Sequence, residues 1–351
     1  MSRTSSIIEN NNLILITGSG GFIGSRVVRA LLEFGFSNLR CLVRPSSNLN
    51  ALKEVIKYHN EAIVDIVKGN LLSQKLCNDI TNGVQVIYHL AAGRGEKSYP
   101  DAYLNSVVTT RNLLQGAIQH DFIKRFVNVS SFTVYSNWHT KHGSLIDETS
   151  ETETNPVLRG EPYCYAKVKQ EQITIDFCRK HHIPYVIIRP GVVYGPGNKG
   201  IHGRVGIGTF GIFLHLGGTN IIPMTYVDNC ADAITLSGIK TGVDNEIFNV
   251  VDDELPTSRY FLFKYKKNVK YFKSLYVPYR LFYLFCWLWE KYSNWSQGQL
   301  PPSFNRKMCS TYWKGNRYSN QKLKRSLQWS PRVNFHDALD KYFVYQREVV
   351  K

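Results

Sequence analysis

A glycine-rich turn between a strand and a helix, close to the N-terminus, constrains the fold of this chain more than any other segment. The apolar run Leu13–Ile16 predicts a buried strand, and three glycines spaced as Gly18, Gly21 and Gly24 follow it directly. A helical pattern of apolar residues begins at once after the turn. Gly18 allows a sharp turn, Gly21 lets backbone approach a phosphate, and Gly24 lets the helix pack on the strand. The segment therefore predicts a pyrophosphate site of a dinucleotide at a helix N-terminus.

Strand-like and helix-like segments alternate along the first half of the chain. Amphipathic stretches of helix length, such as 103–118 and 163–179, separate short apolar runs. This alternation predicts an α/β fold: a doubly wound parallel sheet (Rossmann) with helices on both faces and a smaller, mostly C-terminal substrate lobe. The candidate strands are Leu13–Ile16, Leu39–Val43, Ala62–Val67, Val84–His89, Phe126–Val129, Tyr185–Ile188 and Glu246–Val250.

The alternation stops after Pro190, where glycine-rich chain follows, and it returns briefly between residues 226 and 250. We therefore expect residues 12–190 and 226–250 to form a dinucleotide-binding, NAD(P)-binding Rossmann domain. Residues 191–225 and 251–351 are then expected to form the substrate-binding lobe.

Composition narrows the class of partner. The chain has 351 residues and a formal net charge of +16, which favours anionic partners such as nucleotide phosphates or acidic membrane surfaces. No nucleic-acid module is recognisable, so no nucleic acid is predicted as a partner. The 7 cysteines are scattered without a C-x-x-C pair, which favours reduced thiols and predicts no metal site. A polar N-terminus and the lack of any stretch of about 20 apolar residues predict a cytoplasmic protein.

One segment of the C-terminal lobe, Tyr276–Trp289, is apolar and aromatic and allows two interpretations. It could be a helix on the surface of an anionic membrane, which would make the protein peripheral on the inner membrane face. It could instead be a buried helix under the substrate cleft with a solvated basic loop beside it, and this is what we expect. The basic residues that precede it are Arg259, Lys264, Lys266, Lys267, Lys270 and Lys273.

The residues that could carry chemistry follow the fifth candidate strand and open a helix. Ser130 and Ser131 stand at the carboxyl end of that strand, where ligands bind in open α/β sheets. Tyr163 and Lys167 are four residues apart and share one helix face. A neighbouring ammonium group lowers the pKa of a phenol from its usual value of ~10, which lets the tyrosine shuttle a proton while a hydride moves at carbon. A serine hydroxyl can polarise the same carbonyl oxygen.

Spacing alone does not identify the tyrosine. Tyr165 and Lys169 have the same separation and lie on about the opposite face of the same helix. A surface pair with this spacing is also common.

Several further motifs occur in a fixed order, and with them the chain resembles an extended short-chain dehydrogenase/reductase of the NAD-dependent epimerase/dehydratase family. The likeness covers about Leu13–Val250 and is specific for the superfamily, not for a substrate. The motifs that carry it are Thr17-Gly18-x-x-Gly21-x-x-Gly24, His89-Leu90-Ala91-Ala92, Asn105 to Asn112, Ser131, Pro162-Tyr163-x-x-Ala166-Lys167, Arg189-Pro190-Gly191-Val192-Val193-Tyr194-Gly195, Tyr226-Val227-Asp228-Asn229 and Phe248-Asn249-Val250.

The resemblance implies roles for individual residues. Tyr163 is then the proton carrier, Ser131 the catalytic serine, Lys167 the residue that tunes the tyrosine and holds the nicotinamide ribose, and Asn105 a support of the active site. It also implies a homodimer through helices near residues 105–119 and 163–180. The cofactor-binding residues it implies are Gly18, Gly21, Phe22, Ile23, Gly24, Arg44, Asn70, Leu71, Leu90, Ala91, Ala92, Lys167, Pro190 and Val193.

Departures from the family pattern refine the expectation. Arg44 stands where NAD enzymes of this fold usually carry an acidic residue, so NADP is favoured over NAD. Asn70 replaces the usual aspartate at the adenine. Phe132 and Thr133 follow the serine where dehydratases carry an Asp-Glu pair, which argues against elimination of water.

The substrate class stays open between three hypotheses. The first is an NAD(P)-dependent epimerase or oxidoreductase that transfers a hydride at a secondary alcohol or ketone of a nucleotide sugar. The arginine that many such epimerases place before Tyr226 is absent, although Arg204, Arg259 or Arg306 could bind a pyrophosphate. The second is an oxidoreductase similar to 3β-hydroxysteroid or sterol dehydrogenases that acts on an apolar alcohol. The third, a non-catalytic NAD(P)-binding protein, is disfavoured by the intact serine, tyrosine and lysine.

Overall fold

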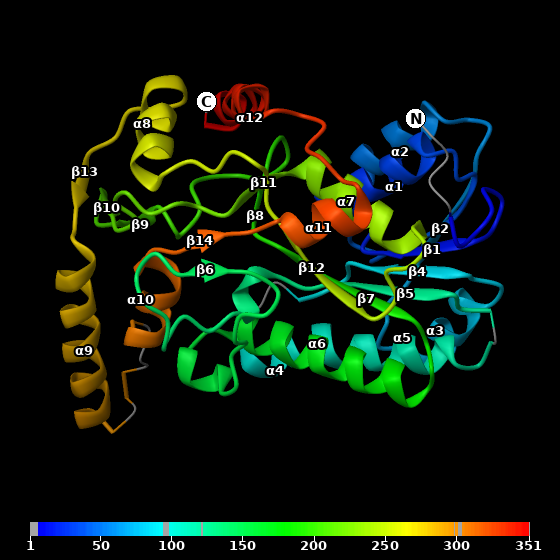
Figure 1. Cartoon of the computed structure of the whole chain (residues 1–351), viewed down its shortest axis with the longest axis horizontal. Helices are drawn as coiled ribbons and strands as arrows, with labels where there is room; N and C mark the ends of the chain where they lie inside the picture. The colour runs from blue at the N-terminus through cyan, green and yellow to red at the C-terminus, as the bar shows by residue number, and fades with distance from the viewer. Residues whose placement is uncertain (1–5, 94–97, 121, 298, 301–303, 351) are drawn as a thin grey trace.

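The computed structural model describes residues 6–93, 98–120, 122–297, 299–300 and 304–350. Within these residues, seven parallel strands form one sheet in the order β12-β7-β5-β4-β1-β2-β3 (Figure 1). This is the doubly wound Rossmann arrangement that the alternation of apolar runs predicts, so the fold class is confirmed. The strands are β1 (Ile14–Thr17), β2 (Asn38–Val43), β3 (Ile63–Lys68), β4 (Val86–His89), β5 (Arg125–Val129), β7 (Tyr185–Pro190) and β12 (Glu246–Val250).

The order of strands reverses between β1 and β4. Ile14 of β1 lies between Leu39 of β2 and Val86 of β4, so the chain builds outward first on one side of β1 and then on the other. At such a reversal the loops that leave the two strands diverge and open a crevice at their carboxyl ends. The glycine turn leaves β1 at this point.

Helices cover both faces of the sheet, because strands buried on two sides need two apolar partners. Ile14 and Ile16 pack on one face and Leu15 packs on the other, which follows from the alternation of side chains along a strand. Each such buried side chain stabilises the fold by about 1.5–3 kcal/mol. The first face carries α1 (Gly24–Glu33), α2 (Asn50–Lys57), α7 (Val227–Ile239) and α11 (Gln321–Leu327), and the second carries α3 (Gln74–Thr81), α5 (Thr109–Ala117) and α6 (Pro162–Lys180) (Figure 1).

The remaining elements pack beside the carboxyl ends of the strands and have an aromatic core of their own, with Phe261, Tyr265 and Tyr342 buried together. The strands are β8 (Val192–Tyr194) with β11 (Met224–Tyr226); β9 (Gly206–Thr209) with β10 (Ile212–His215) and β13 (Ser274–Tyr276); and β6 (Leu145–Ile146) with β14 (Arg317–Tyr318). The helices are α8 (Ser258–Asn268), α9 (Tyr279–Trp295), α10 (Arg306–Trp313) and α12 (Phe335–Val350).

The division into a Rossmann domain and a lobe stays a prediction, and α11 departs from its boundaries. Leu323, Leu327 and Trp329 belong to the core that α1 and α7 form on the sheet, although they lie within the stretch 251–351 expected in the lobe. The chain therefore returns to the sheet after it has built the lobe.

The prediction that the aromatic segment is a buried helix is wrong. In α9 only Phe282, Cys286 and Ser293 are buried, while Leu281, Leu288 and Trp295 are 58%, 53% and 76% exposed. The physical reason is that α10 covers one side of α9 and nothing among the described residues covers the other. Across the described part of the chain, no helix combines the length and apolarity needed to span a bilayer.

Candidate active site

The glycine turn has the geometry that its spacing predicts. Gly18 has φ of +71°, a left-handed conformation that favours glycine, and the Gly21 N–H donates to the Gly18 carbonyl oxygen at 3.0 Å. A Cβ at Gly24 would stand 2.1 Å from that same carbonyl oxygen, so no larger residue fits there. The turn brings the N-terminus of α1 to the crevice, which is where a phosphate binds well.

A cleft of about 930 Å³ runs from this turn across the carboxyl ends of the strands. Every residue that the sequence and the family resemblance assign to catalysis or cofactor binding lines it. These are Gly18, Gly21, Phe22, Ile23, Gly24, Arg44, Asn70, Leu71, Leu90, Ala91, Ala92, Asn105, Ser131, Tyr163, Lys167, Pro190 and Val193.

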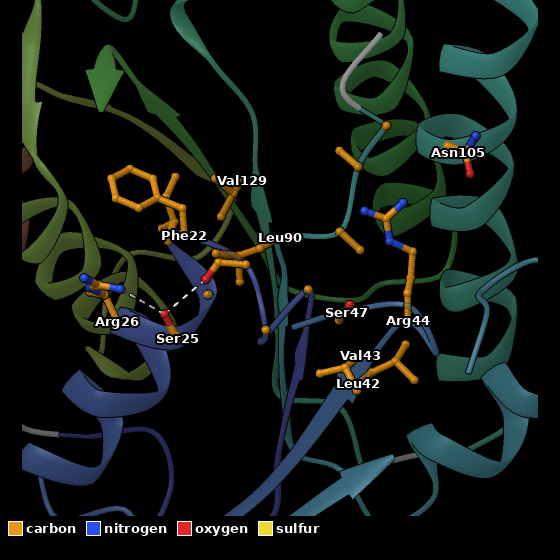
Figure 2. A pocket seen from close by; sticks show the side chains of 18 of the residues that line it. Phe22, Ser25, Arg26, Leu42, Val43, Arg44, Ser47, Leu90, Asn105 and Val129 are labelled. Carbon is orange, nitrogen blue, oxygen red and sulfur yellow. Dashed lines mark hydrogen bonds between the residues drawn. The ribbon is translucent and has the colours of Figure 1, made fainter. Parts of the chain in front are cut away.

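The cleft is positively charged. Among the described residues that line it there is no Asp or Glu, whereas Arg26, Arg44 and Lys167 all contribute cations. Figure 2 shows Arg26 and Arg44 on opposite sides of the cleft. Arg44 follows β2 directly, is exposed, and lies near Ser46 and Ser47. Hydroxyls and a guanidinium therefore stand where a carboxylate would bind a ribose.

Ser131 and Tyr163 meet at the floor of the cleft. The Ser131 hydroxyl caps a short 3₁₀ turn, η2 (Phe132–Val134), by accepting from the Thr133 N–H at 3.2 Å. Burial raises the pKa of the Tyr163 phenol, and a hydrogen bond with Ser131 opposes that rise. The net shift of the Tyr163 pKa is therefore upward, and the expected effect of Lys167 on it stays a prediction.

Lys167 is held from behind. Its Nζ donates to the Val129 carbonyl oxygen at 2.7 Å and to Gln170 Oε1 at 2.9 Å. Gln170 Nε2 donates in turn to the Thr110 hydroxyl at 2.9 Å. Burial lowers the pKa of Lys167 to about 8, and the negative charge of Glu171 opposes that shift. The lysine is therefore fixed in position, and its pKa of about 8 lies close to neutral pH.

The alternative pair on the same helix lies outside the cleft. Tyr165 packs edge-on against Tyr99, with 5.4 Å between ring centroids, and the half-buried Lys169 donates to Gln172 at 3.3 Å. Neither residue lines the cleft. Tertiary packing thus separates two pairs that spacing leaves equivalent.

Asn105 lies in a π-helical turn, η1 (Leu104–Val108), which joins α4 (Tyr99–Tyr103) to α5. Such wide turns inside helices are frequent at functional sites. The Asn105 amide nitrogen donates to the backbone and side-chain oxygens of Asp101, each at 3.0 Å. The side chain therefore lines the cleft with its nitrogen already satisfied.

A buried charged network next to Ser131 escaped the sequence analysis. Glu171 accepts from the Ser130 hydroxyl at 2.6 Å and forms an ion pair with Arg189, and both of these charged residues are buried. Arg189 also donates to the Tyr135 hydroxyl at 3.0 Å, which donates to Asn249 Oδ1 at 2.7 Å. The available signal was Glu171 itself, four residues after Lys167 on the same helix face.

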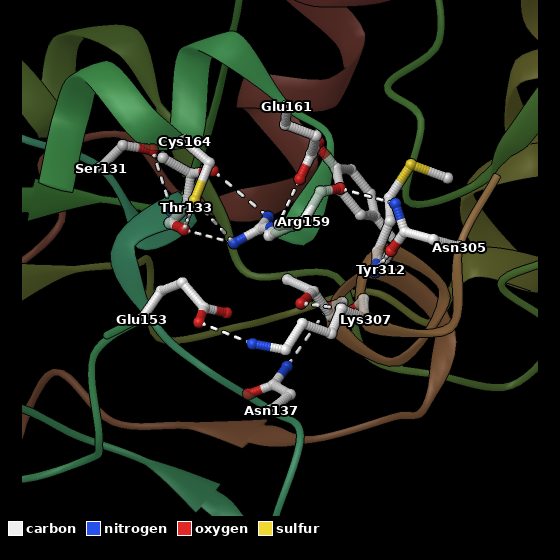
Figure 3. Close-up of polar contacts among 12 residues, drawn as sticks. Ser131, Thr133, Asn137, Glu153, Arg159, Glu161, Cys164, Asn305, Lys307 and Tyr312 are labelled. Carbon is white, nitrogen blue, oxygen red and sulfur yellow. Dashed lines mark hydrogen bonds and ion pairs between the residues drawn. The ribbon is translucent and has the colours of Figure 1, made fainter. Parts of the chain in front are cut away.

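A second missed cluster lies just beyond Ser131 (Figure 3). The buried Arg159 donates to the carbonyl oxygen of Thr133 and forms an ion pair with Glu161. Tyr312 of α10 donates to Glu161 at 2.7 Å. Phe132 and Thr133 thus stand next to a carboxylate that is already paired, and no free acid replaces the Asp-Glu pair of dehydratases among the described neighbours.

The three arginines considered for a pyrophosphate are dispersed. Arg204 donates to the Thr311 carbonyl oxygen at 3.0 Å, Arg306 forms an ion pair with Glu290 at 2.7 Å, and Arg259 lies over the ring of Tyr276. None of them lines the cleft.

Comparison with known proteins identifies the family of this chain. A family profile described as "NAD dependent epimerase/dehydratase family" matches residues 14–250. The chain belongs to this family. Among curated relatives of the family, cinnamoyl-CoA reductase 2 of Medicago truncatula is 27% identical over 55% of this chain and 57% of its own length. The dTDP-glucose 4,6-dehydratase of Streptomyces niveus is 30% identical over 52% of this chain and 54% of its own length. The matches thus span just over half of these relatives.

Several solved structures match over nearly the whole chain. The dTDP-glucose 4,6-dehydratase DesIV of Streptomyces venezuelae, described with NAD and TYD bound, superposes with a TM-score of 0.71 at 22% identity, covering 96% of this chain and 97% of that one. UDP-glucose 4-epimerase of Thermotoga maritima superposes with a TM-score of 0.70 at 20% identity, covering 97% and 100%. At these identities the likeness shows the fold alone.

The cysteines and acidic residues form no further reactive centre in the described ranges. All seven cysteines are described, buried and free. No group of three His, Cys, Asp or Glu is placed to hold a metal ion in the part of the chain that the structure describes.

Proposed function

We propose that this protein is an NAD(P)-dependent oxidoreductase or epimerase that acts by hydride transfer at a secondary alcohol or ketone. The observation that carries the proposal is that Ser131, Tyr163 and Lys167 line the same cleft as the glycine turn. This single cleft offers both a phosphate site and a proton carrier.

The cleft fits a nicotinamide dinucleotide. Gly24 excludes any side chain at the turn, and about 930 Å³ suffices for a cofactor together with part of a substrate. When bound, the cofactor supplies or accepts the hydride. Lys167 lines the same cleft and would be the residue that holds the nicotinamide ribose.

Tyr163 moves the proton at the substrate oxygen. Its raised pKa keeps the phenol protonated at neutral pH, so it is a donor, which suits reduction of a ketone. Ser131, hydrogen-bonded to Tyr163, orients the same oxygen. Ser131 caps the 3₁₀ turn η2 and Tyr163 lies in the first turn of the helix α6, so both hydroxyls are carried by regular elements.

NADP is the proposed cofactor in preference to NAD. Arg44 stands at the end of β2 with Ser46, Ser47 and Asn48 beside it, and the lining offers no carboxylate to ribose hydroxyls. A guanidinium binds a 2′-phosphate through charge-assisted hydrogen bonds.

For the substrate we propose a nucleotide sugar. Relatives at 30% and 31% identity are named dTDP-glucose 4,6-dehydratase and uncharacterized UDP-glucose epimerase, and a net charge of +16 attracts anionic substrates. Dehydration is not part of the proposal, because Phe132 and Thr133 replace the acid and base. An apolar alcohol is the second candidate, since Arg204, Arg259 and Arg306 all lie away from the cleft.

The test uses purified protein with NADPH or NADP and separate panels of UDP- and dTDP-sugars and of sterols. Nicotinamide absorbance and product configuration by NMR are followed. Tyr163→Phe is expected to lower kcat by roughly 100-fold or more, because it removes the proton donor. Tyr165→Phe is the matched control on the same helix and is expected to spare activity.

Each other outcome revises the proposal. Turnover of a sterol and of no sugar nucleotide would reverse the two substrate classes. Loss of activity in Tyr165→Phe with retention in Tyr163→Phe would show that Tyr165, on the opposite face of the helix, is the proton carrier. Tight cofactor binding without any turnover would favour the non-catalytic alternative. The homodimer and the cytoplasmic location remain predictions from sequence.

A further inference from the structure

The lobe carries an apolar surface that nothing among the described residues covers. On α9 the exposed side chains Leu281, Leu284, Leu288, Tyr292 and Trp295 follow one another at intervals of three or four residues. Residues with this spacing share one face of a helix. They form a second apolar stripe, separate from the one that faces α10.

The opposite stripe accounts for how α9 is attached. Phe282 and Cys286 pack with Cys309 and Trp313 of α10 in a small core. A helix that is apolar on all sides is normally buried in protein or lipid. The side of α9 that faces α10 is buried in this way, whereas the other apolar side has no apolar partner among the described residues.

The apolar surface continues beyond the helix. The strand β13 precedes α9, pairs with β10, and exposes Leu275 and Tyr276. At the tip of the β9–β10 hairpin, Phe210 is fully exposed and has φ of +45°, a conformation that bulky residues rarely adopt. Figure 1 shows α9, β13 and this hairpin along one edge of the molecule. We call these exposed residues of α9, β13 and the hairpin tip the edge surface.

Positive charge accompanies the edge surface. No Asp or Glu occurs between Leu255 and Trp289 in the sequence, and none of the basic residues in that stretch forms an ion pair among the described residues. Arg259, Lys267, Lys270, Lys273 and Arg280 are exposed. The aromatic composition of the surface, with Trp and Tyr beside Lys and Arg, is that of groups that settle at the headgroup level of a membrane.

We propose that the edge surface docks on an anionic lipid bilayer, with the exposed stripe of α9 inserted among the acyl chains. The lysines of α8 and of the segment between α8 and β13 then lie on the phosphates. Charge decides between this occupant and a second copy of the chain. A two-fold contact through the edge surface would bring two patches of positive charge together, whereas an anionic membrane offers both apolar depth and negative charge. The docking is independent of the proposed catalysis and is tested without it.

The test is co-sedimentation of the full chain with vesicles of phosphatidylcholine, with and without roughly a quarter phosphatidylglycerol, at low and high salt. The wild type is expected to bind the anionic vesicles and to be released by salt. Combining Leu281→Ser, Leu284→Ser and Leu288→Ser is expected to abolish binding. Combining Lys267→Gln, Lys270→Gln and Lys273→Gln is expected to weaken it about 100-fold, because each lysine near an anionic surface contributes about fivefold.

The matched control combines Tyr58→Ser and Ile63→Ser, which remove two exposed apolar side chains at the far edge of the sheet, and it should bind like the wild type. A readout on the unaltered protein guards against misfolded variants. Three of the 6 tryptophans, Trp287, Trp289 and Trp295, lie on α9, so brominated lipids should quench the emission of the wild type.

Three results would overturn the docking. The first is failure of the wild type to bind anionic vesicles. The second is equal binding by the control and both edge variants. The third is that the wild type binds no vesicles but forms a dimer in lipid-free buffer, which the leucine variant converts to a monomer. The last result would assign the surface to a second copy. None of them bears on turnover, so failure here leaves the proposed reaction unaffected.

Discussion

The buried pair of Glu171 and Arg189 offers the sharpest test of how the cleft is supported. Glu171→Gln keeps the shape of the side chain and removes its charge. The guanidinium of Arg189, which is 3% exposed, then loses its carboxylate, although its hydrogen bond to Tyr135 remains. Removal of one partner of a buried pair costs about 3–5 kcal/mol, because the other charge stays buried without compensation.

The expected shift in melting temperature follows from the size of the chain. An unfolding entropy of about 2.1 cal/mol/K per residue, summed over 351 residues, is roughly 0.7 kcal/mol/K. A loss of about 3–5 kcal/mol then lowers Tm by roughly 4–7 °C if the domain unfolds as one unit. Calorimetry at neutral pH measures it. Glu33→Gln, which removes the exposed pair with Arg332, is the control and should cost at most about 1 kcal/mol.

The same substitution has a readout that a purely structural role would not move. The charge of Glu171 raises the pKa of Lys167, so removal of that charge is expected to lower the pKa of Lys167 from its present value of about 8. If turnover requires the charged lysine, the alkaline limb of the pH profile of kcat/KM moves to lower pH. A Tm equal to that of Glu33→Gln, or a limb that stays in place while Tm falls, would refute the reasoning.

Two further substitutions probe the cofactor and a buried carboxyl. Arg44→Asp is expected to lower the preference for NADPH over NADH by roughly 10–100-fold in kcat/KM, because a charge-assisted hydrogen bond contributes about 1.5–3 kcal/mol. Substitution of the exposed Lys53 by Asp should leave the ratio of kcat/KM for NADPH to that for NADH unchanged. An unaltered ratio in both variants would remove the argument for a 2′-phosphate. Burial raises the pKa of Asp252 from 3.8 to about 7, over the opposing hydrogen bonds from Tyr226 and Thr225. The folded state therefore binds a proton that the unfolded state releases, and stability is expected to fall as pH rises from about 4 to 7. Asp252→Asn should flatten this part of a Tm profile against pH, and a profile parallel to that of the wild type would show that the carboxyl does not titrate there.

Local rules predicted most of the sheet and the glycine turn. Apolar runs mark the strands because strands buried on both faces tolerate few polar residues, and the observed bounds shift by two residues at most, as at Val86–His89. The turn could be predicted from Gly18 and Gly24 because their conformations and contacts exclude larger residues. The same rules left Tyr163 and Tyr165 equivalent; the resemblance to a family favoured Tyr163, and tertiary packing places only Tyr163 in the cleft.

The sequence by itself determined the Rossmann sheet and the phosphate-binding turn, because these depend on side-chain periodicity and on a backbone that only glycine adopts. The residues expected along the cleft came instead from the resemblance to a family. Tertiary structure alone decided the rest. It turned Lys167 toward Val129 and Gln170, and it joined Glu171 to Arg189 from separate elements. It also left one side of α9 uncovered. Burial and pairing depend on which neighbour arrives from a distant part of the chain, and the local pattern does not carry that information.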